Sequence, residues 1–184
     1  MAPGSRGVAF LRAINVGGSH VVKMDRLKKL FEHAGFTGVD TYIASGNVVF
    51  DLSPSTKGAT VERTIEKMLL DALGYDVATF VRTGRELRAA AEHEPFAPAA
   101  LKASLRFNVA FVKQPLDTRA VTAIKGLATA VEDFHVRGRE IYWLSRVMQS
   151  ESKVSNAVFE KALAQPSTVR GISTVRKMAE KYGS

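Results

Sequence analysis

The spacing of hydrophobic residues changes along the first part of the chain in a way that predicts alternating strands and helices. Val8 to Ile14 is a nearly continuous apolar run, typical of a buried strand. From Asp25, apolar residues three or four positions apart predict a helix that ends at Gly35, with Phe36 packing back on Phe31. The chain therefore opens with a strand followed by a helix.

A hairpin is predicted next, over Thr41 to Phe50. Its β-prone arms, Thr41 to Ile43 and Val48 to Phe50, flank a Ser45-Gly46-Asn47 turn in which Gly and Asn tolerate a positive φ. A helix over Thr60 to Leu73 and a strand over Val77 to Val81 follow. Strand, helix, hairpin, helix and strand form the split βαβ, or ferredoxin-like, unit.

A second unit is predicted after a short boundary. Thr83 and Glu86 form a capping box that opens a connecting helix, and the prolines of Pro95-Phe-Ala-Pro98 interrupt both helix and strand. We therefore predict an α+β fold of two tandem ferredoxin-like units with antiparallel sheets. The first unit, with the connecting helix, takes residues 1–95, and the second, with a C-terminal helix, takes 96–184.

The second half repeats this order of elements. Its strands and helices are signalled by alternating apolar positions, by helix-capping residues and by a tight turn at Arg137-Gly138-Arg139-Glu140. The predicted elements are a strand over Arg106 to Val112, a helix from Pro115 and Asp117, strands over Phe134 to Val136 and Ile141 to Leu144, a helix capped by Ser155, a strand over Thr168 to Arg170 and a helix over Thr174 to Tyr182.

Composition narrows the class of protein. The 184 residues are 46% hydrophobic and include no cysteine, which excludes disulfides, thiolate metal sites and cysteine nucleophiles. With no secretory signal and no apolar run long enough for a membrane span, we expect a cytoplasmic protein. The formal charge of +8 favours an anionic partner, either a small molecule or nucleic acid. The sequence leaves the oligomeric state open.

Topology predicts one candidate ligand site, because the end of the first strand meets the start of the third in a ferredoxin-like sheet. Bare glycine N–H groups, a hydroxyl, amides and nearby cations would suit an oxyanion. The alternative is that glycine and asparagine are simply what tight turns require. The residues of this first corner are Arg12, Asn15, Gly17, Gly18, Ser45, Gly46 and Asn47.

The matching position of the second unit is a second candidate site. Lys113 follows its first strand, and Arg137 and Arg139 occupy its hairpin. These three residues form the second basic corner, which would suit a phosphate backbone or an acidic partner. The alternative is that exposed turns carry arginine for solubility.

Other chemistry finds little support in the sequence. Histidines at positions 20, 33, 93 and 135 show no metal-binding spacing, and neither a phosphate-binding P-loop nor a dinucleotide fingerprint occurs. No metal and no cofactor are therefore expected. The strand phenylalanines are assigned to the core rather than to base stacking. Because Tyr142 and Trp143 alternate across one strand, only one of them is expected to face the core.

The chain also resembles a known family. Arg12-Ala-Ile-Asn-Val-Gly-Gly18, Lys23-Met24 and Thr41-Tyr-Ile-Ala-Ser-Gly-Asn-Val-Val-Phe50 are similar to the signature of domain of unknown function 1697, and Glu94-Pro-Phe96 extends the match. Toward the C-terminus Arg170 and Thr174 match, whereas Gly171 and Ile172 replace the family's Asn and Trp. The resemblance implies ferredoxin-like halves and no particular activity, and it adds Lys23, counted here with the first corner, and Arg170 to the candidate residues.

Three hypotheses follow for the function. The first is a binding protein for an anionic ligand, either a phosphate-containing small molecule or nucleic acid. The second is a metal-independent enzyme acting on a small phosphorylated or carboxylated metabolite. In the third, the motif around Asn15 and Ser45 to Asn47 serves the fold alone, and function lies in an interface.

Overall fold

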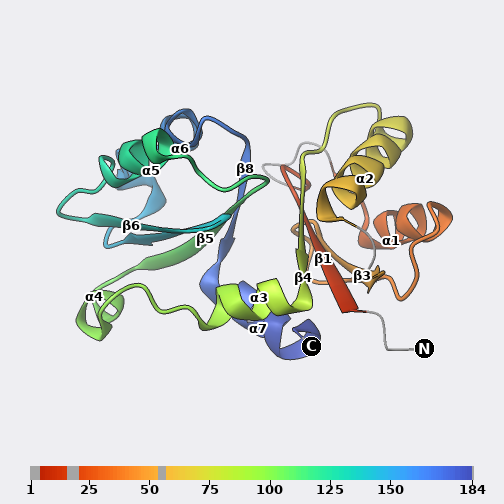
Figure 1. The fold of residues 1–184 in the computed structure, drawn as a ribbon, viewed down its shortest axis with the longest axis horizontal. Coiled ribbons are helices and arrows are strands. Elements are labelled where there is room, and N and C mark those ends of the chain that lie inside the picture. Colours follow the sequence, from red (N-terminus) through yellow and green to blue (C-terminus); the bar gives the residue numbers. More distant parts are fainter. Residues whose placement is uncertain (1–4, 16–20, 54–56, 184) are drawn as a thin grey trace. The chain divides into compact units, whose positions relative to one another are not determined.

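The structure, a computed structural model, describes residues 5–15, 21–53 and 57–183. The first part of the chain forms an antiparallel four-stranded sheet in the order β2-β3-β1-β4. Helices α1 and α2 lie along one face of this sheet (Figure 1). Its elements are β1 (Ser5–Leu11), α1 (Met24–His33), β2 (Asp40–Thr41), β3 (Asn47–Leu52), α2 (Gly58–Leu73) and β4 (Thr79–Thr83).

The second part forms another antiparallel four-stranded sheet, in the equivalent order β6-β7-β5-β8. Helices α5 and α6 pack on one of its faces (Figure 1). The predicted α+β fold of two ferredoxin-like units is confirmed. The remaining elements are α3 (Gly84–Glu92), α4 (Pro98–Lys102), β5 (Arg106–Val112), α5 (Thr118–Lys125), β6 (Glu132–Arg137), β7 (Glu140–Ser145), the 3₁₀ turn η1 (Gln149–Glu151), α6 (Asn156–Leu163), β8 (Ser167–Gly171) and α7 (Ile172–Tyr182).

Contacts divide the chain into Met1–Ala89 with Lys177–Ser184 as one unit, and Ala90–Arg176 as the other. The chain therefore passes between units inside α3 and inside α7. This grouping differs from the boundary that the sequence suggests between residues 95 and 96, and that boundary stays a prediction about domains.

Each unit has its own hydrophobic core between its sheet and two helices. In the first unit, Leu27 and Phe31 of α1 and Ile65 of α2 pack on strand residues such as Leu11 and Phe50. In the second unit, Ile124 of α5 and Phe159 of α6 pack with Ile141 and Trp143. Burial of these side chains is the main stabilising term for each unit.

Local signals set the ends of several helices. Gly35 has a φ of +89°, and the Phe31 and Phe36 rings lie 5.4 Å apart, as the sequence predicts. The Thr83 and Glu86 capping box forms, with the Thr83 N–H donating to the Glu86 carboxylate at 2.8 Å. The Asp117 carboxylate and Ser155 hydroxyl cap α5 and α6 by accepting backbone N–H bonds.

The first hairpin differs from its prediction. Strand β2 covers only Asp40–Thr41, and Ile43 is exposed with a φ of +50°. The turn is longer because the Tyr42 N–H donates to the Asn47 carbonyl at 3.0 Å, which makes the intervening residues a loop. A β-branched residue rarely adopts a positive φ, so the loop must be held in place by other contacts.

Carboxylates cover the outer side of edge strand β4. The Val81 N–H donates to Glu62 and the Thr79 N–H to Glu66, both at 2.8 Å, and both glutamates lie on α2. Glu86 accepts from Thr83 on the same strand. The backbone donors that face away from β1 are therefore satisfied by side chains, a device that blocks further strand pairing.

Candidate functional site

The first corner forms where the end of β1 meets the bend before β3. The Leu11 N–H donates to the Gly46 carbonyl at 2.8 Å. Gly46 has a φ of +71°, and a Cβ added there would lie 3.1 Å from the Ile14 Cβ and 3.2 Å from the Leu11 Cβ. The glycine is therefore required both for its backbone conformation and for close packing against the loop after β1.

Asn15 joins three pieces of chain at this corner. Its side-chain oxygen accepts the Val22 N–H at 2.7 Å, and its amide nitrogen donates to the carbonyls of Val22 at 2.9 Å and Ala44 at 3.1 Å. The residue has a φ of +57°, which asparagine tolerates better than most residues. These bonds connect the loop after β1 to the segment before α1 and to the hairpin, so the Asn15 amide acts as a structural cross-link.

Asn47 performs a similar task inside the hairpin. Its side chain is fully buried, and its amide nitrogen donates to the Tyr42 carbonyl at 3.0 Å and the Ser45 hydroxyl at 2.9 Å. Such a buried amide is costly unless its polar atoms are paired. The two asparagines of the motif thus hold the corner together from within.

The cations of the first corner differ in exposure. Arg12 is half-buried, with its backbone N–H donating to the Ala78 carbonyl at 2.9 Å, while Lys23 is exposed just before α1. Gly17 and Gly18, also predicted as site residues, lie outside the described residues. A cavity of about 400 Å³ lined by Thr37, Asp51 and their neighbours lies at the other end of β3.

Arg170 belongs to the second unit, on β8. Its guanidinium donates to the Thr168 hydroxyl at 2.7 Å and to the Val169 carbonyl at 2.9 Å. Burial lowers the pKa of Arg170 to about 10. The side chain therefore remains cationic at neutral pH, although it is held against its own strand.

Arg82, an arginine that is fully buried, was not identified from the sequence. It lies on β4, is 0% exposed, and donates to the Val81 carbonyl at 2.9 Å, as Arg170 does to Val169. Arg82 pairs with Val8 and Arg170 with Val109, which are equivalent positions of the two sheets. A short internal repeat could have revealed it: Val81-Arg82 with Arg88, Ala91 and Glu92 has the same spacing as Val169-Arg170 with Arg176, Ala179 and Glu180.

The helices that follow these strands extend the repeat. In the first unit, the Arg88 guanidinium donates to the Gly183 carbonyl at 2.7 Å. In the second unit, the Arg176 guanidinium donates to the Ala91 carbonyl at 3.3 Å and lies 3.8 Å from the Glu94 carboxylate. Each arginine thus satisfies a carbonyl close to a helix C-terminus, where cations are stabilising.

The second basic corner also forms in the structure. The Val112 N–H at the end of β5 donates to the Arg139 carbonyl at 3.0 Å, so Lys113 lies beside the β6–β7 turn. In the strand register, Arg137 of β6 lies opposite Glu140 of β7 across that turn, and Gly138 has a φ of +59°. The three predicted cations therefore lie at one end of this sheet, with Arg137 exposed and Lys113 and Arg139 half-buried.

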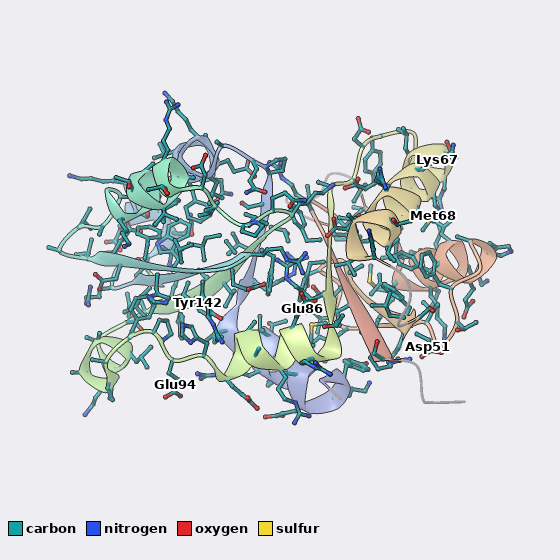
Figure 2. All side chains as sticks on the ribbon, in the orientation of Figure 1. Asp51, Lys67, Met68, Glu86, Glu94 and Tyr142 are labelled. Carbon is teal, nitrogen blue, oxygen red and sulfur yellow. The ribbon has the colours of Figure 1, made fainter. Side chains whose placement is uncertain are left out.

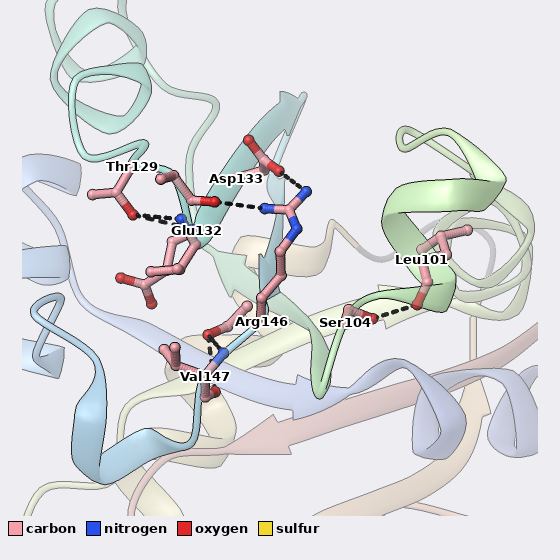
Figure 3. A network of polar contacts seen from close by, with 10 residues as sticks. Leu101, Ser104, Thr129, Glu132, Asp133, Arg146 and Val147 are labelled. Carbon is pink, nitrogen blue, oxygen red and sulfur yellow. Dashed lines mark hydrogen bonds and ion pairs between the residues drawn. The ribbon is translucent and has the colours of Figure 1, made fainter.

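The opposite end of the β6–β7 hairpin is closed by a polar network (Figure 3). The Arg146 guanidinium donates to Asp133 at 2.9 Å, and the Glu132 N–H donates to the Thr129 hydroxyl at 3.1 Å. The buried Glu132 carboxylate accepts bonds from the Trp143 ring at 3.2 Å and the Ser152 hydroxyl at 2.7 Å. Both bonds go to the same carboxylate oxygen, Oε1, so Glu132 links β7 to the segment before α6.

Tyr142 and Trp143 lie on opposite faces of β7, as their alternation predicts, and both are buried. Trp143 packs in the core with α6, where its ring lies 5.1 Å from Phe159. Tyr142 lies on the other face (Figure 2). Its hydroxyl donates to the Ala90 carbonyl at 3.1 Å, and its ring lies 4.9 Å from His93. On the face without helices α5 and α6, Tyr142 is thus covered by the end of α3 and the segment that follows it.

Asp40 is a polar centre of the first unit that the sequence analysis did not predict as a site. The Tyr182 hydroxyl donates to its carboxylate at 2.6 Å, and the Lys181 ammonium lies 3.3 Å away. The hydrogen bond from Tyr182, more than any other contact, lowers the pKa of Asp40 below its usual value of 3.8. This contact ties the end of α7 to β2.

Among the residues that the structure describes, no group of three His, Asp or Glu side chains is arranged to hold a metal ion. The described helices also include none with the length and apolar character of a membrane span.

The fold and its two strand-end corners define a class of α+β protein made of two ferredoxin-like units. The chain belongs to the family described as "Protein of unknown function (DUF1697)", whose model matches residues 5–142. No curated protein matches the chain. A solved structure of the conserved bacterial protein SP0830 from Streptococcus pneumoniae shares the fold, with a TM-score of 0.76 and 22% identity over 98% of this chain and 99% of that one.

Proposed function

We propose that the protein binds an anionic ligand, a nucleic acid or another phosphate-containing molecule, through the second basic corner. The observation that carries the proposal is the placement of Lys113, Arg137 and Arg139 at one end of the second sheet, fixed by the Val112–Arg139 backbone bond. Clustered cations on a rigid turn attract phosphate groups at long range and bind them at contact. The net charge of +8 acts in the same direction.

The first corner supports a different function for its motif. The side-chain amides of Asn15 and Asn47 form hydrogen bonds with backbone atoms of the surrounding loops and, for Asn47, also with the Ser45 hydroxyl, as a structural cross-link would. We propose that these asparagines and Gly46 serve the fold, and that Arg12 and Lys23 add positive charge beside them. An anionic ligand at this corner would bind to the cations rather than to the amides.

Fluorescence anisotropy with labelled single-stranded oligothymidine of about 12 nucleotides tests the proposal. The triple variant Lys113→Ser/Arg137→Ser/Arg139→Ser should bind the oligonucleotide at least about 10-fold more weakly at low salt. The slope of its log affinity plotted against log salt concentration should also be shallower than the wild-type slope by roughly 2. The matched control, Lys28→Ser/Lys29→Ser/Arg63→Ser, removes equal charge from exposed helix positions of the first unit.

Three outcomes are distinguishable. Selective loss of binding in the corner variant supports the proposal. Equal loss in both variants shows attraction to overall charge and removes the corner as a site. If the wild-type protein does not bind the oligonucleotide, pyrophosphate in a thermal-shift assay tests the small-molecule form, since a ligand that binds the folded state raises Tm. Absence of both effects overturns the function.

A further inference from the structure

A cluster of titratable rings lies behind the second basic corner. His135 of β6 pairs with Tyr142 of β7, and His93 reaches them from the segment after α3. The two histidine ring centroids lie 5.1 Å apart, and His93 and Tyr142 lie 4.9 Å apart. Arg137 is two residues beyond His135 on the same strand, so the side chains of His135 and Arg137 share one face of the sheet. The cluster and the corner are therefore neighbours.

One nitrogen in this cluster has no hydrogen-bond partner. His93 Nε2 is buried and makes no hydrogen bond, whereas the Tyr142 hydroxyl is used by the Ala90 carbonyl. A neutral imidazole carries one N–H donor and one acceptor nitrogen, and both nitrogens become donors when the ring is protonated. An unpartnered ring nitrogen is thus a position at which a proton and an anionic acceptor can be gained together.

The charges around the rings are mostly positive. Burial, followed by the charges of Arg137 and His135, lowers the pKa of His93. Burial, followed by Lys125 at the end of α5 and by Arg137, lowers the pKa of His135. Both rings are therefore neutral at neutral pH.

The remaining titratable groups near the rings do not change this balance at neutral pH. Burial and then the Glu140 carboxylate raise the pKa of Tyr142 to about 12, so the phenol is neutral as well. Glu140, across the turn from Arg137, is the acidic group that acts on this cluster from β7. On the segment after α3, Glu94 faces Arg176 at 3.8 Å, and on β6 Asp133 faces Arg146 at 2.9 Å.

An anion bound at Arg137 would reverse the electrostatic balance. It would offset the positive charges that disfavour ring protonation, and protonated rings would in turn strengthen the attraction of the corner for the anion. Linkage requires the two effects to be equal in free energy. We propose that His93 and His135 couple anion binding at the second basic corner to proton uptake, so that a phosphate-bearing ligand binds more tightly at mildly acidic pH. This proposal rests on the proposed function of that corner.

Oligothymidine is a suitable probe because neither its bases nor its phosphodiesters titrate between about pH 5.5 and 7.5. At constant ionic strength, wild-type affinity should rise roughly 5- to 10-fold from about pH 7.5 to 5.5. The variant His93→Gln/His135→Gln should match the wild-type affinity at the higher pH and lose most of the rise. His33→Gln is the matched control, an exposed histidine of the first unit that should keep the full rise.

A measurement on the unmodified protein decides the matter even if the double variant folds poorly. NMR titration of the histidine rings should show the pKa values of His93 and His135 rising when the oligonucleotide is bound, with His33 unchanged. Binding at about pH 7.5 with no change in either ring overturns the coupling and leaves the proposed function intact. Absence of oligonucleotide binding across the whole pH range overturns the coupling, and the pyrophosphate thermal-shift assay then decides the proposed function.

Discussion

The two strand-end corners share one backbone solution and differ in the side chains placed on it. In each unit the N–H of the last residue of the first strand donates to a carbonyl in the facing bend: Leu11 to Gly46 at 2.8 Å, and Val112 to Arg139 at 3.0 Å. The first corner then directs amides inward, through Asn15 and Asn47. The second carries cations. The difference shows that a motif rich in polar residues can serve to hold loops together, whereas a turn without such a motif can carry the cationic side chains.

The comparison is tested most strongly by the glycines of the two bends. Gly46→Ala should lower the free energy of unfolding by about 3 kcal/mol, because the new Cβ combines a positive φ with contacts of 3.1–3.2 Å. Gly138→Ala should cost only about 1 kcal/mol, since its φ is +59° but the nearest atom is 3.9 Å away. Urea denaturation followed by circular dichroism measures both. Equal losses would contradict the tighter packing of the first corner.

A smaller effect is expected from the buried amide of the first corner. Asn47→Ala should lower the free energy of unfolding by about 2 kcal/mol, because the Tyr42 carbonyl and Ser45 hydroxyl lose a buried partner. Asn156→Ala, at an exposed position of α6, is the matched control and should change it by less than about 0.5 kcal/mol. The Lys113→Ser/Arg137→Ser/Arg139→Ser variant should likewise keep nearly full stability. If it unfolds as readily as Asn47→Ala, both corners are structural.

The smallest effect concerns pH. Because the folded pKa values of His93 and His135 lie below the usual 6.5, the unfolded chain binds more protons as the pH falls. The free energy of unfolding should therefore be constant above about pH 7.5 and decrease by roughly 1 kcal/mol between pH 6.5 and about 5. Fluorescence of Trp143, the single tryptophan and a member of the second unit, follows the change.

The same pH series separates the two units. The contribution of Asp40 to the free energy of unfolding is lost at lower pH than that of the histidines. The pKa of Asp40 is below 3.8, and its stabilising bond to Tyr182 is retained until the carboxylate is protonated. The variant His93→Gln/His135→Gln should remove the dependence near pH 6 and leave the acid transition unchanged. A flat profile between pH 6.5 and 5 in the wild-type protein would argue against buried neutral histidines in the second unit.

Local physics made much of the fold predictable from sequence. Gly35 and Gly74 end their helices with positive φ values, and Asp117 and Ser155 cap the helices that follow them. Each of these features depends on residues a few positions apart. The order of elements then restricts the topology. That topology correctly predicted that Asn15 lies near the bend at Gly46.

The rest depends on contacts between residues far apart in the chain. No local sequence pattern indicates that the ring of His93 contacts that of His135, that Tyr182 donates a hydrogen bond to Asp40, or that Arg88 donates one to the Gly183 carbonyl. The use of the Asn15 amide was equally hidden, since the same residue can bind a ligand or a backbone carbonyl, and only the folded neighbours decide between them. The repeat around Arg82 and Arg170 was a further long-range signal present in the sequence.

The row of glutamates along β4 has a consequence for how the protein behaves at high concentration. An incoming strand from another polypeptide needs free N–H groups in order to extend a sheet, and on this border Glu62, Glu66 and Glu86 already hold them. Because carboxylate oxygens cover these N–H donors, this edge of the sheet also repels the carbonyl groups of an approaching strand. Growth of the first sheet into fibrils from this side is therefore suppressed while the carboxylates stay ionised.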